Sequence, residues 1–268
     1  MTGLAGRIGK ATATTLLAGT VGGVALLAGE AIAARNRRYA KPTMGLALRT
    51  SMGPSSAPVL RLVLLGDSAA IGVGVEWLSE TVGGQLARLL AEGTPPTGER
   101  HVFLSSVGVA GSRSTDLATQ VARALLGERP DVAVVLIGQN DATALRGPED
   151  SAGYLGAAVR RLRDAGVQVV VGTCPDLGAL RSVAPPLRQV TGWLGRRMAR
   201  AQARAVLDAD GVVVDLAEET GAVFRADAGT LCHDGFHPSA DGYRVWAHAL
   251  YPAVAQAALA SSRPAAQE

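Results

Sequence analysis

The chain has 268 residues, of which 48% are hydrophobic and 18% charged, and this composition excludes an intrinsically disordered protein. The formal net charge is only +3, and no basic stripe interleaved with aromatic residues is present, so we expect no nucleic-acid partner. Cysteine occurs only at Cys174 and Cys232, without the spacing of metal ligands to a histidine pair. The sequence therefore predicts neither a metal nor a cofactor.

Residues 1–41 predict an apolar anchor or signal segment with basic flanks. Residues 11–29 carry no charge over 19 positions, a length that can just span a bilayer. Ala31-Ile32-Ala33 offers a small-residue cleavage site, and an ordinary buried helix is the remaining alternative. We expect a membrane-anchored or secreted protein. The topology stays open, because the positive-inside rule places the domain in the cytoplasm whereas a signal peptide exports it.

Residues 42–58 contain three prolines and predict a linker, so residues 59–268 form one domain. Short apolar runs rich in β-branched residues predict strands at 59–66, 102–107, 132–138, 167–173 and 211–216. Stretches with helical period lie at 77–92, 114–127, 150–165, 187–208 and 239–259. This alternation predicts an α/β fold with a parallel sheet and helices on both faces. In such folds, ligands bind beyond the carboxyl ends of the strands.

Four short motifs stand where such a sheet builds its site. They are Gly66-Asp67-Ser68 after the first strand, Gly108 after the second, Gly138-Gln139-Asn140-Asp141 after the third, and Asp234-Gly235-Phe236-His237 before the last helix. Each motif alone has an ordinary explanation as a helix cap, a tight turn or a surface loop. Together they supply the nucleophile, the base and the hydrogen-bond donors of an acyl-transfer site.

The four motifs resemble those of the SGNH (GDSL-like) hydrolase superfamily, whose eponymous residues match Ser68, Gly108, Asn140 and His237. The resemblance covers about residues 59–259 in the family's order. It implies a flavodoxin-like three-layer sandwich with a five-stranded parallel sheet, to which this chain adds an N-terminal apolar helix. Two departures from the family pattern, at Ser106 and at Ala69-Ala70, leave the subfamily and the acyl pocket open.

The resemblance implies a serine esterase that hydrolyses carboxylic esters through an acyl-enzyme intermediate. Ser68 is the expected nucleophile. His237 is the expected general base, since an unperturbed histidine has a pKa of about 6.5. Asp234, three residues before it on the same loop, can turn back to orient the imidazole.

The resemblance assigns the oxyanion hole to the backbone amides of Ser68 and Gly108 and to the side chain of Asn140. We expect Asp67 and Asp141 to hold these loops in place, although helix capping explains both residues nearly as well. The expected partners are a small-molecule ester, a lipid or an acylated glycan, and a membrane through the N-terminal segment. The alcohol and acyl groups stay open between lipid esters, O-acetylated carbohydrates and thioesters.

Several alternatives remain at the level of the sequence. A membrane-tethered, catalytically silent domain that binds esters or glycans is one, but such a domain would be expected to lose Ser68, Asn140 or His237. The two cysteines either form a disulfide that pins the histidine loop or stay free thiols. The stretch 187–208 is a lid, a membrane-facing surface or a covering helix. Three aromatic residues either line a substrate pocket or belong to the core: Trp77, Trp193 and Phe236.

Overall fold

The computed structural model describes residues 22–43, 49–93 and 98–261. Its centre is one sheet of six strands in the order β1-β3-β2-β4-β5-β6. All neighbours from β3 to β6 pair in parallel. Without β1 the spatial order of the strands is 2-1-3-4-5, the flavodoxin-like order. The strands are β1 (Arg49–Met52), β2 (Val59–Gly66), β3 (His101–Ser106), β4 (Val132–Leu136), β5 (Gln168–Gly172) and β6 (Val212–Val214).

The expected purely parallel sheet of five strands is wrong in one respect. Arg49–Met52, inside the segment expected to be a linker, forms β1 and pairs antiparallel with β3, with Arg49 opposite Ser105. The side chains of β1 alternate between exposed and half-buried. Three of the four residues are polar, so the run is too short and too polar to be recognised from an apolar pattern. The sheet is therefore mixed.

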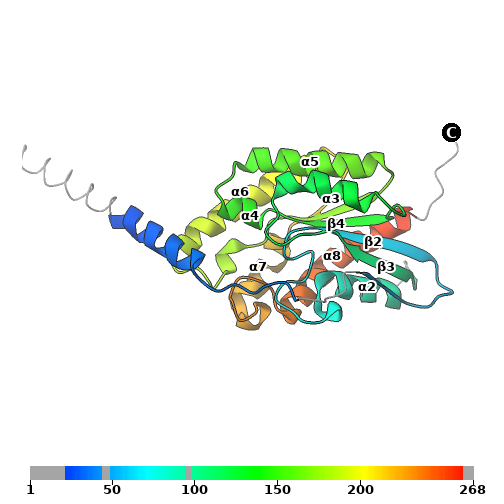
Figure 1. The fold of residues 1–268 in the computed structure, drawn as a ribbon, viewed down its shortest axis with the longest axis horizontal. Helices are drawn as coiled ribbons and strands as arrows, with labels where there is room; N and C mark the ends of the chain where they lie inside the picture. The colour runs from blue at the N-terminus through cyan, green and yellow to red at the C-terminus, as the bar shows by residue number, and fades with distance from the viewer. Residues whose placement is uncertain (1–21, 44–48, 94–97, 262–268) are drawn as a thin grey trace, which may run out of the picture.

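Helices cover both faces of the sheet and produce three layers (Figure 1). Residues of β2 alternate between the layers, since Leu62 and Leu64 pack in one apolar cluster and Val63 and Leu65 in the other. Helices α2, α7 and α8 belong to the first cluster, and α3, α5 and α6 to the second. The helices are α2 (Val82–Glu92), α3 (Leu117–Ala124), α4 (Gln139–Thr143), α5 (Pro148–Asp164), α6 (Leu187–Leu207), α7 (Leu216–Ala226) and α8 (Ala240–Ser261).

Two helices were not expected from the sequence, and α2 and α3 begin a few residues later than expected. The helix α3 starts at Leu117 after a 3₁₀ turn at Ser114–Asp116. The last apolar run stops at β6, after which the Asp215 side chain accepts hydrogen bonds from the amides of Ala217 and Glu218 and starts α7. The short helix α4 follows Gly138. The stretch expected as a helix from residue 77 opens with a 3₁₀ turn at Leu78–Glu80, and α2 begins only after Thr81 caps it.

Residues 22–35 are helical and mostly exposed. The apolar stretch 11–29 lies largely outside the described residues, so membrane insertion stays a prediction. Within the described ranges, no helix has the length and apolar character needed to cross a bilayer. Glu30 Oε2 accepts a hydrogen bond of 2.8 Å from the amide of Leu187, the first residue of α6. Figure 1 shows this N-terminal helix, in blue, projecting from the domain at that point.

The disulfide considered from the sequence is not formed. Cys174 and Cys232 are both free thiols. The amide of Cys174 donates to Gln202 Oε1, and the thiol of Cys232 donates to Asp234 Oδ1 at 3.2 Å. Burial raises the pKa of the Cys232 thiol to about 11, so this residue stays protonated at neutral pH.

Candidate active site

The expected nucleophile lies on a tight turn, residues 67–75, which we call the serine turn. Gly66 ends β2, and both Asp67 and Ser68 are buried. The amide of Val73 donates to the carbonyl of Ser68 at 3.0 Å, which closes the turn. The Tyr243 hydroxyl of α8 donates to the carbonyl of Val73 at 2.7 Å. Hydrogen bonds therefore fix the serine turn both internally and against α8.

The second element is the loop of residues 232–238, which we call the histidine loop. The amide of Cys232 donates to the carbonyl of His237 at 2.8 Å, and the amide of Gly235 donates to the carbonyl of Cys232 at 2.9 Å. Gly235 takes a φ of +66°, a conformation that favours glycine. These bonds fold the loop back on itself and bring Asp234 next to His237.

Asp234 and His237 form a buried hydrogen-bonded pair. His237 Nδ1 lies 2.6 Å from Asp234 Oδ2. Asp234 Oδ1 accepts hydrogen bonds from the amides of Phe236 at 2.8 Å and His237 at 2.9 Å. An ionised carboxylate only accepts hydrogen bonds, so His237 Nδ1 carries the proton and Nε2 keeps its lone pair. The pair therefore presents the nitrogen that a general base needs.

The surroundings of Asp234 keep it ionised. Burial alone would raise the pKa of this carboxyl. The hydrogen bonds from the His237 ring and from the amides of Ala40, His237 and Phe236 outweigh burial and hold the pKa well below its usual range. Asp234 is thus a fixed negative charge behind the imidazole.

The serine turn and the histidine loop pack directly against each other at Gly74. A Cβ atom on Gly74 would lie 2.5 Å from the carbonyl oxygen of Pro238 and 3.3 Å from His237 Cβ. Gly74 has a φ of +107°, so both the conformation and the contact require glycine here. The structure shows no hydrogen bond between the Ser68 hydroxyl and the His237 ring. In enzymes without substrate such contacts are often long.

Two further expected residues lie beside the serine turn. Asn140 Nδ2 donates to Asp67 Oδ2 at 3.3 Å and to the carbonyl of Ser112 at 2.9 Å. The amide of Gly108 makes a weak hydrogen bond of 3.3 Å to Ser106 Oγ. A Cβ atom on Gly108 would lie 2.7 Å from Ala70 Cβ. Within the described part of the chain, no group accepts a hydrogen bond from the Ser68 amide. This edge of the sheet therefore gathers three N–H donors.

Asp67 is buried immediately before the expected nucleophile. Burial raises the pKa of its carboxyl to about 6, although the hydrogen bond from the amide of Ala69 acts in the opposite direction. Asp67 Oδ1 accepts from the Ala69 amide at 3.0 Å. Asp67 therefore bridges the serine turn and Asn140.

Asp141 ties different elements together. Its carboxylate accepts hydrogen bonds from the amide and the hydroxyl of Ser114, in the 3₁₀ turn before α3, and from the hydroxyl of Ser151 in α5. These contacts anchor α4, which carries Asn140, to two neighbouring elements.

Two glutamines hold the ends of strands in place, and the sequence analysis did not identify either of them. Gln120 of α3 accepts a hydrogen bond from the amide of Gly66 at 2.7 Å and donates to its carbonyl at 2.9 Å. Gln202 of α6 donates to the carbonyl of Ile137 at 2.8 Å and accepts from the amide of Cys174 at 2.7 Å. Both are buried. Each occupies the apolar face of an amphipathic helix, a signal that the helical period could have provided.

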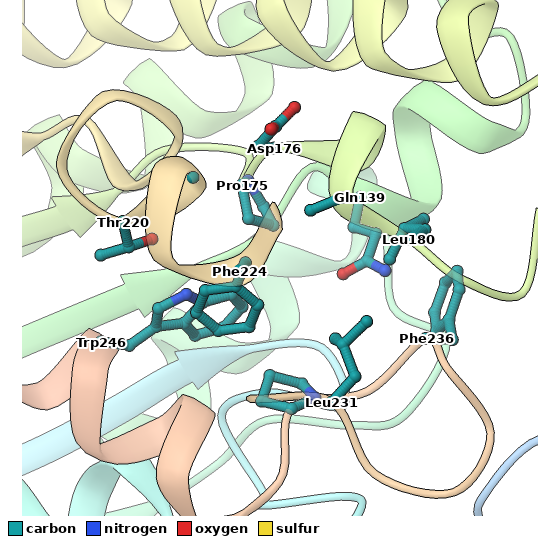
Figure 2. Close-up of a pocket in the computed structure, with 12 residues that line it drawn as sticks. Gln139, Pro175, Asp176, Leu180, Thr220, Phe224, Leu231, Phe236 and Trp246 are labelled. Carbon is teal, nitrogen blue, oxygen red and sulfur yellow. The ribbon is translucent and has the colours of Figure 1, made fainter. Parts of the chain in front are cut away.

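A small cavity lies beside the histidine loop (Figure 2). It measures about 20 Å³, room for a single water molecule. Figure 2 shows Phe224 and Trp246 side by side at one end and Phe236 at the other, with Gln139 and Leu180 between them. A larger open groove of about 820 Å³ lies between the 3₁₀ turn before α3 and α5. That groove includes Asp141, but neither the groove nor the small cavity is lined by Ser68 or His237, so we assign neither to the chemistry.

The three aromatic residues considered from the sequence have different surroundings. Trp77 is 66% exposed and Trp193 is 50% exposed, so neither belongs to the core. Arg197 lies over the Trp193 ring at 4.7 Å from its centroid. Phe236 contacts the His237 ring edge to face, with centroids 5.0 Å apart. Only Phe236 is placed to shape the surroundings of the histidine.

A sheet of this topology, with a serine turn and a histidine loop meeting at its carboxyl edge, defines the SGNH hydrolase class. Residues 64–245 match the model of the GDSL-like lipase/acylhydrolase family. The chain belongs to this family.

Individual relatives agree with this assignment. The chain is 42% identical over 200 residues to the GDSL-like esterase Rv1075c of Mycobacterium tuberculosis, covering 74% of this chain and 62% of the relative, so it spans less than two thirds of that protein's length. The solved structure of TesA matches with a TM-score of 0.59 at 19% identity, covering 74% of this chain and 99% of TesA. The acetylxylan esterase Axe2 of Geobacillus stearothermophilus matches with a TM-score of 0.54 at 17% identity, covering 75% and 94% of the two chains. At these identities the solved structures establish the α/β fold.

Proposed function

We propose that this protein is a serine esterase that cleaves carboxylic esters through an acyl-enzyme intermediate. The observation that carries the proposal is the buried Asp234–His237 pair, joined at 2.6 Å, on a loop packed against the turn of Ser68. Family membership and the 42% identity to a GDSL-like esterase support the same activity.

The reaction follows from these groups in two steps. Ser68 Oγ forms a bond to the carbonyl carbon of the ester while its proton passes to His237 Nε2. The bond between the acyl carbon and the alcohol oxygen then breaks, and the alcohol leaves with that proton. Water next adds its oxygen to the acyl carbon and gives a proton to His237. That proton returns to Ser68 Oγ as the carboxylic acid departs. Asp234 stabilises the imidazolium that forms in each step.

The negative oxygen of each tetrahedral intermediate needs donors that are already in place. The amides of Ser68 and Gly108 and the side chain of Asn140 are our candidates. Asn140 now donates to Asp67 at 3.3 Å, a long hydrogen bond. The N–H in that bond is the one that Asn140 would redirect toward the oxyanion. Asp67 thus holds the amide in position until substrate arrives.

Short acyl esters are the first substrates to test. The small cavity beside the histidine loop has room for one water molecule and is lined by neither Ser68 nor His237, so it does not set the acyl length. The structural match to an acetylxylan esterase makes O-acetylated carbohydrates one substrate class to test, alongside thioesters and lipid esters.

The test uses p-nitrophenyl esters of increasing acyl length with the full chain. We expect hydrolysis of the acetate, and loss of activity in Ser68→Ala and His237→Ala. Mass spectrometry of the rapidly quenched protein should show one added acetyl group in the wild type and none in Ser68→Ala. Ser51→Ala, a matched change on the exposed side of β1, should behave as wild type. Full activity of Ser68→Ala would overturn the proposal.

A further inference from the structure

A short segment outside the matched family region lies across the expected active site. We call residues 36–43, between the N-terminal helix and the next undescribed residues, the N-terminal arm. The Thr43 hydroxyl donates to the carbonyl of Val75, at the end of the serine turn, at 2.9 Å. The amide of Ala40 donates to Asp234 Oδ2, in the histidine loop, at 2.8 Å. The arm therefore fastens to both elements of the site.

The contact at Ala40 reaches the atom that orients the histidine. Asp234 Oδ2 accepts two hydrogen bonds, one from His237 Nδ1 and one from the Ala40 amide. Asp234 Oδ1, by contrast, is held by groups of the histidine loop itself. Ala40 is thus the donor from outside the loop that fixes the oxygen facing the imidazole. Because hydrogen bonds to a charged acceptor are about twice as strong as neutral ones, this one donor carries substantial positioning energy.

A second contact reaches the histidine through aromatic rings. The Tyr39 ring meets the Phe236 ring at 5.1 Å between centroids, and Phe236 meets His237 at 5.0 Å, both edge to face. The Tyr39 hydroxyl donates to the carbonyl of Ala34 at 2.7 Å, which fixes the ring against the end of the N-terminal helix. Glu30 ties that helix to α6. The arm is therefore anchored on both sides of its contact with the histidine loop.

We infer that the N-terminal arm is a positioning element of the active site, in which Ala40 acts through Asp234 and Tyr39 acts through Phe236 to hold His237. This inference rests on the proposed roles of Ser68, Asp234 and His237. The arm lies upstream of residues 64–245, the region matched by the family model, so these positioning residues are additional to those of the family motifs.

The test compares two substitutions of Ala40 in the full chain. Ala40→Pro removes the N–H donor, whereas Ala40→Gly keeps it. We expect kcat for p-nitrophenyl acetate to fall about tenfold in Ala40→Pro, with KM changed by less than about twofold, because the contact orients the base without touching substrate. Ala40→Gly should retain at least about half of the wild-type kcat. Equal losses in both variants would show that the donor is not the cause and would overturn the inference.

A spectroscopic readout separates positioning from general damage. The proton between His237 Nδ1 and Asp234 should give a far-downfield signal in proton NMR. This signal should shift or broaden in Ala40→Pro and stay in place in Ala40→Gly. An unchanged signal together with an unchanged kcat in Ala40→Pro would overturn the inference.

Two further variants keep the test decisive if Ala40→Pro fails to fold. Tyr39→Ala removes the ring that contacts Phe236, and Tyr39→Phe keeps it. We expect a kcat several-fold lower only in Tyr39→Ala, and equal kcat values in the two would reject the role of the ring. Activity in Ser68→Ala would instead defeat the proposed function. If Ser68→Ala is inactive while Ala40→Pro and Tyr39→Ala are fully active, the proposed function stands and the inference about the N-terminal arm is rejected.

Discussion

The Asn140 side chain donates a hydrogen bond to the Asp67 carboxyl, which is buried at the end of the first parallel strand. This contact joins the residue before the expected nucleophile to a residue expected to bind the oxyanion. It also places a carboxyl group whose pKa is raised to about 6 in the middle of the site. The stability of the fold should therefore depend on pH through Asp67.

Asp67→Asn should remove this dependence. The pKa of Asp67 rises from an ordinary 3.8 to about 6 on folding, so the folded state binds the proton more tightly than the unfolded state. The stabilisation is complete below about pH 4 and is lost as the pH rises through about 6. Relative to wild type, Asp67→Asn should gain up to about 3 kcal/mol of unfolding free energy between pH 4 and pH 7. Urea unfolding at pH 4 and pH 7 measures the difference in unfolding free energy between Asp67→Asn and wild type. A difference that stays the same at the two pH values would contradict the prediction.

Gly108→Ala should impair both stability and catalysis. The added methyl group would lie 2.7 Å from Ala70 Cβ, so either the serine turn or the Gly108 amide must move. We expect kcat to fall about 100- to 1,000-fold, as on loss of an oxyanion donor. The control is Gly153→Ala in α5, where a methyl group meets nothing within 4 Å. That variant should be as active as wild type and slightly more stable. Equal activity of the two variants would contradict the expected role of Gly108.

Gln120→Leu should destabilise the protein by roughly 1–3 kcal/mol, because it leaves the buried amide of Gly66 without a partner. The Gly66 carbonyl loses one donor but keeps its hydrogen bond from the amide of Val109. It should also lower kcat, since Gly66 precedes Asp67 and Ser68. Gln189→Leu makes the same change at an exposed position of α6 and should alter the unfolding free energy by less than about 0.5 kcal/mol. Chemical denaturation measures the unfolding free energies of both variants. Similar losses in the two would show that the hydrogen bonds of Gln120 to Gly66 do not stabilise the fold.

The sequence predicted the central sheet well because continuous apolar runs are unambiguous there. The run 59–66 coincides with β2. The helix α7 was missed, although Asp215 followed by two glutamates is a helix-start signal, because the preceding apolar run was extended through Leu216. The motif residues were found through their order along the chain. That order could not show which of them make contact.

The contact of Ala40 could not have been predicted from the sequence. A backbone amide is present at almost every residue, so the residue type at position 40 does not indicate that its amide donates to Asp234. Its partner lies 194 positions away in the sequence, and only the folded chain brings the two together. Gln120 and Gln202, by contrast, were detectable as polar residues on apolar helix faces.

The antiparallel strand β1 protects an edge that would otherwise be open. It occupies the outer side of β3, where Phe103 is 44% exposed. A chain shortened to begin at Val59 would contain the whole region matched by the family model, yet β3 would present unpaired amides and carbonyls to solvent. Bare sheet edges of this kind recruit strands from neighbouring molecules. Such a shortened chain should self-associate in solution, even with every residue of the four motifs intact.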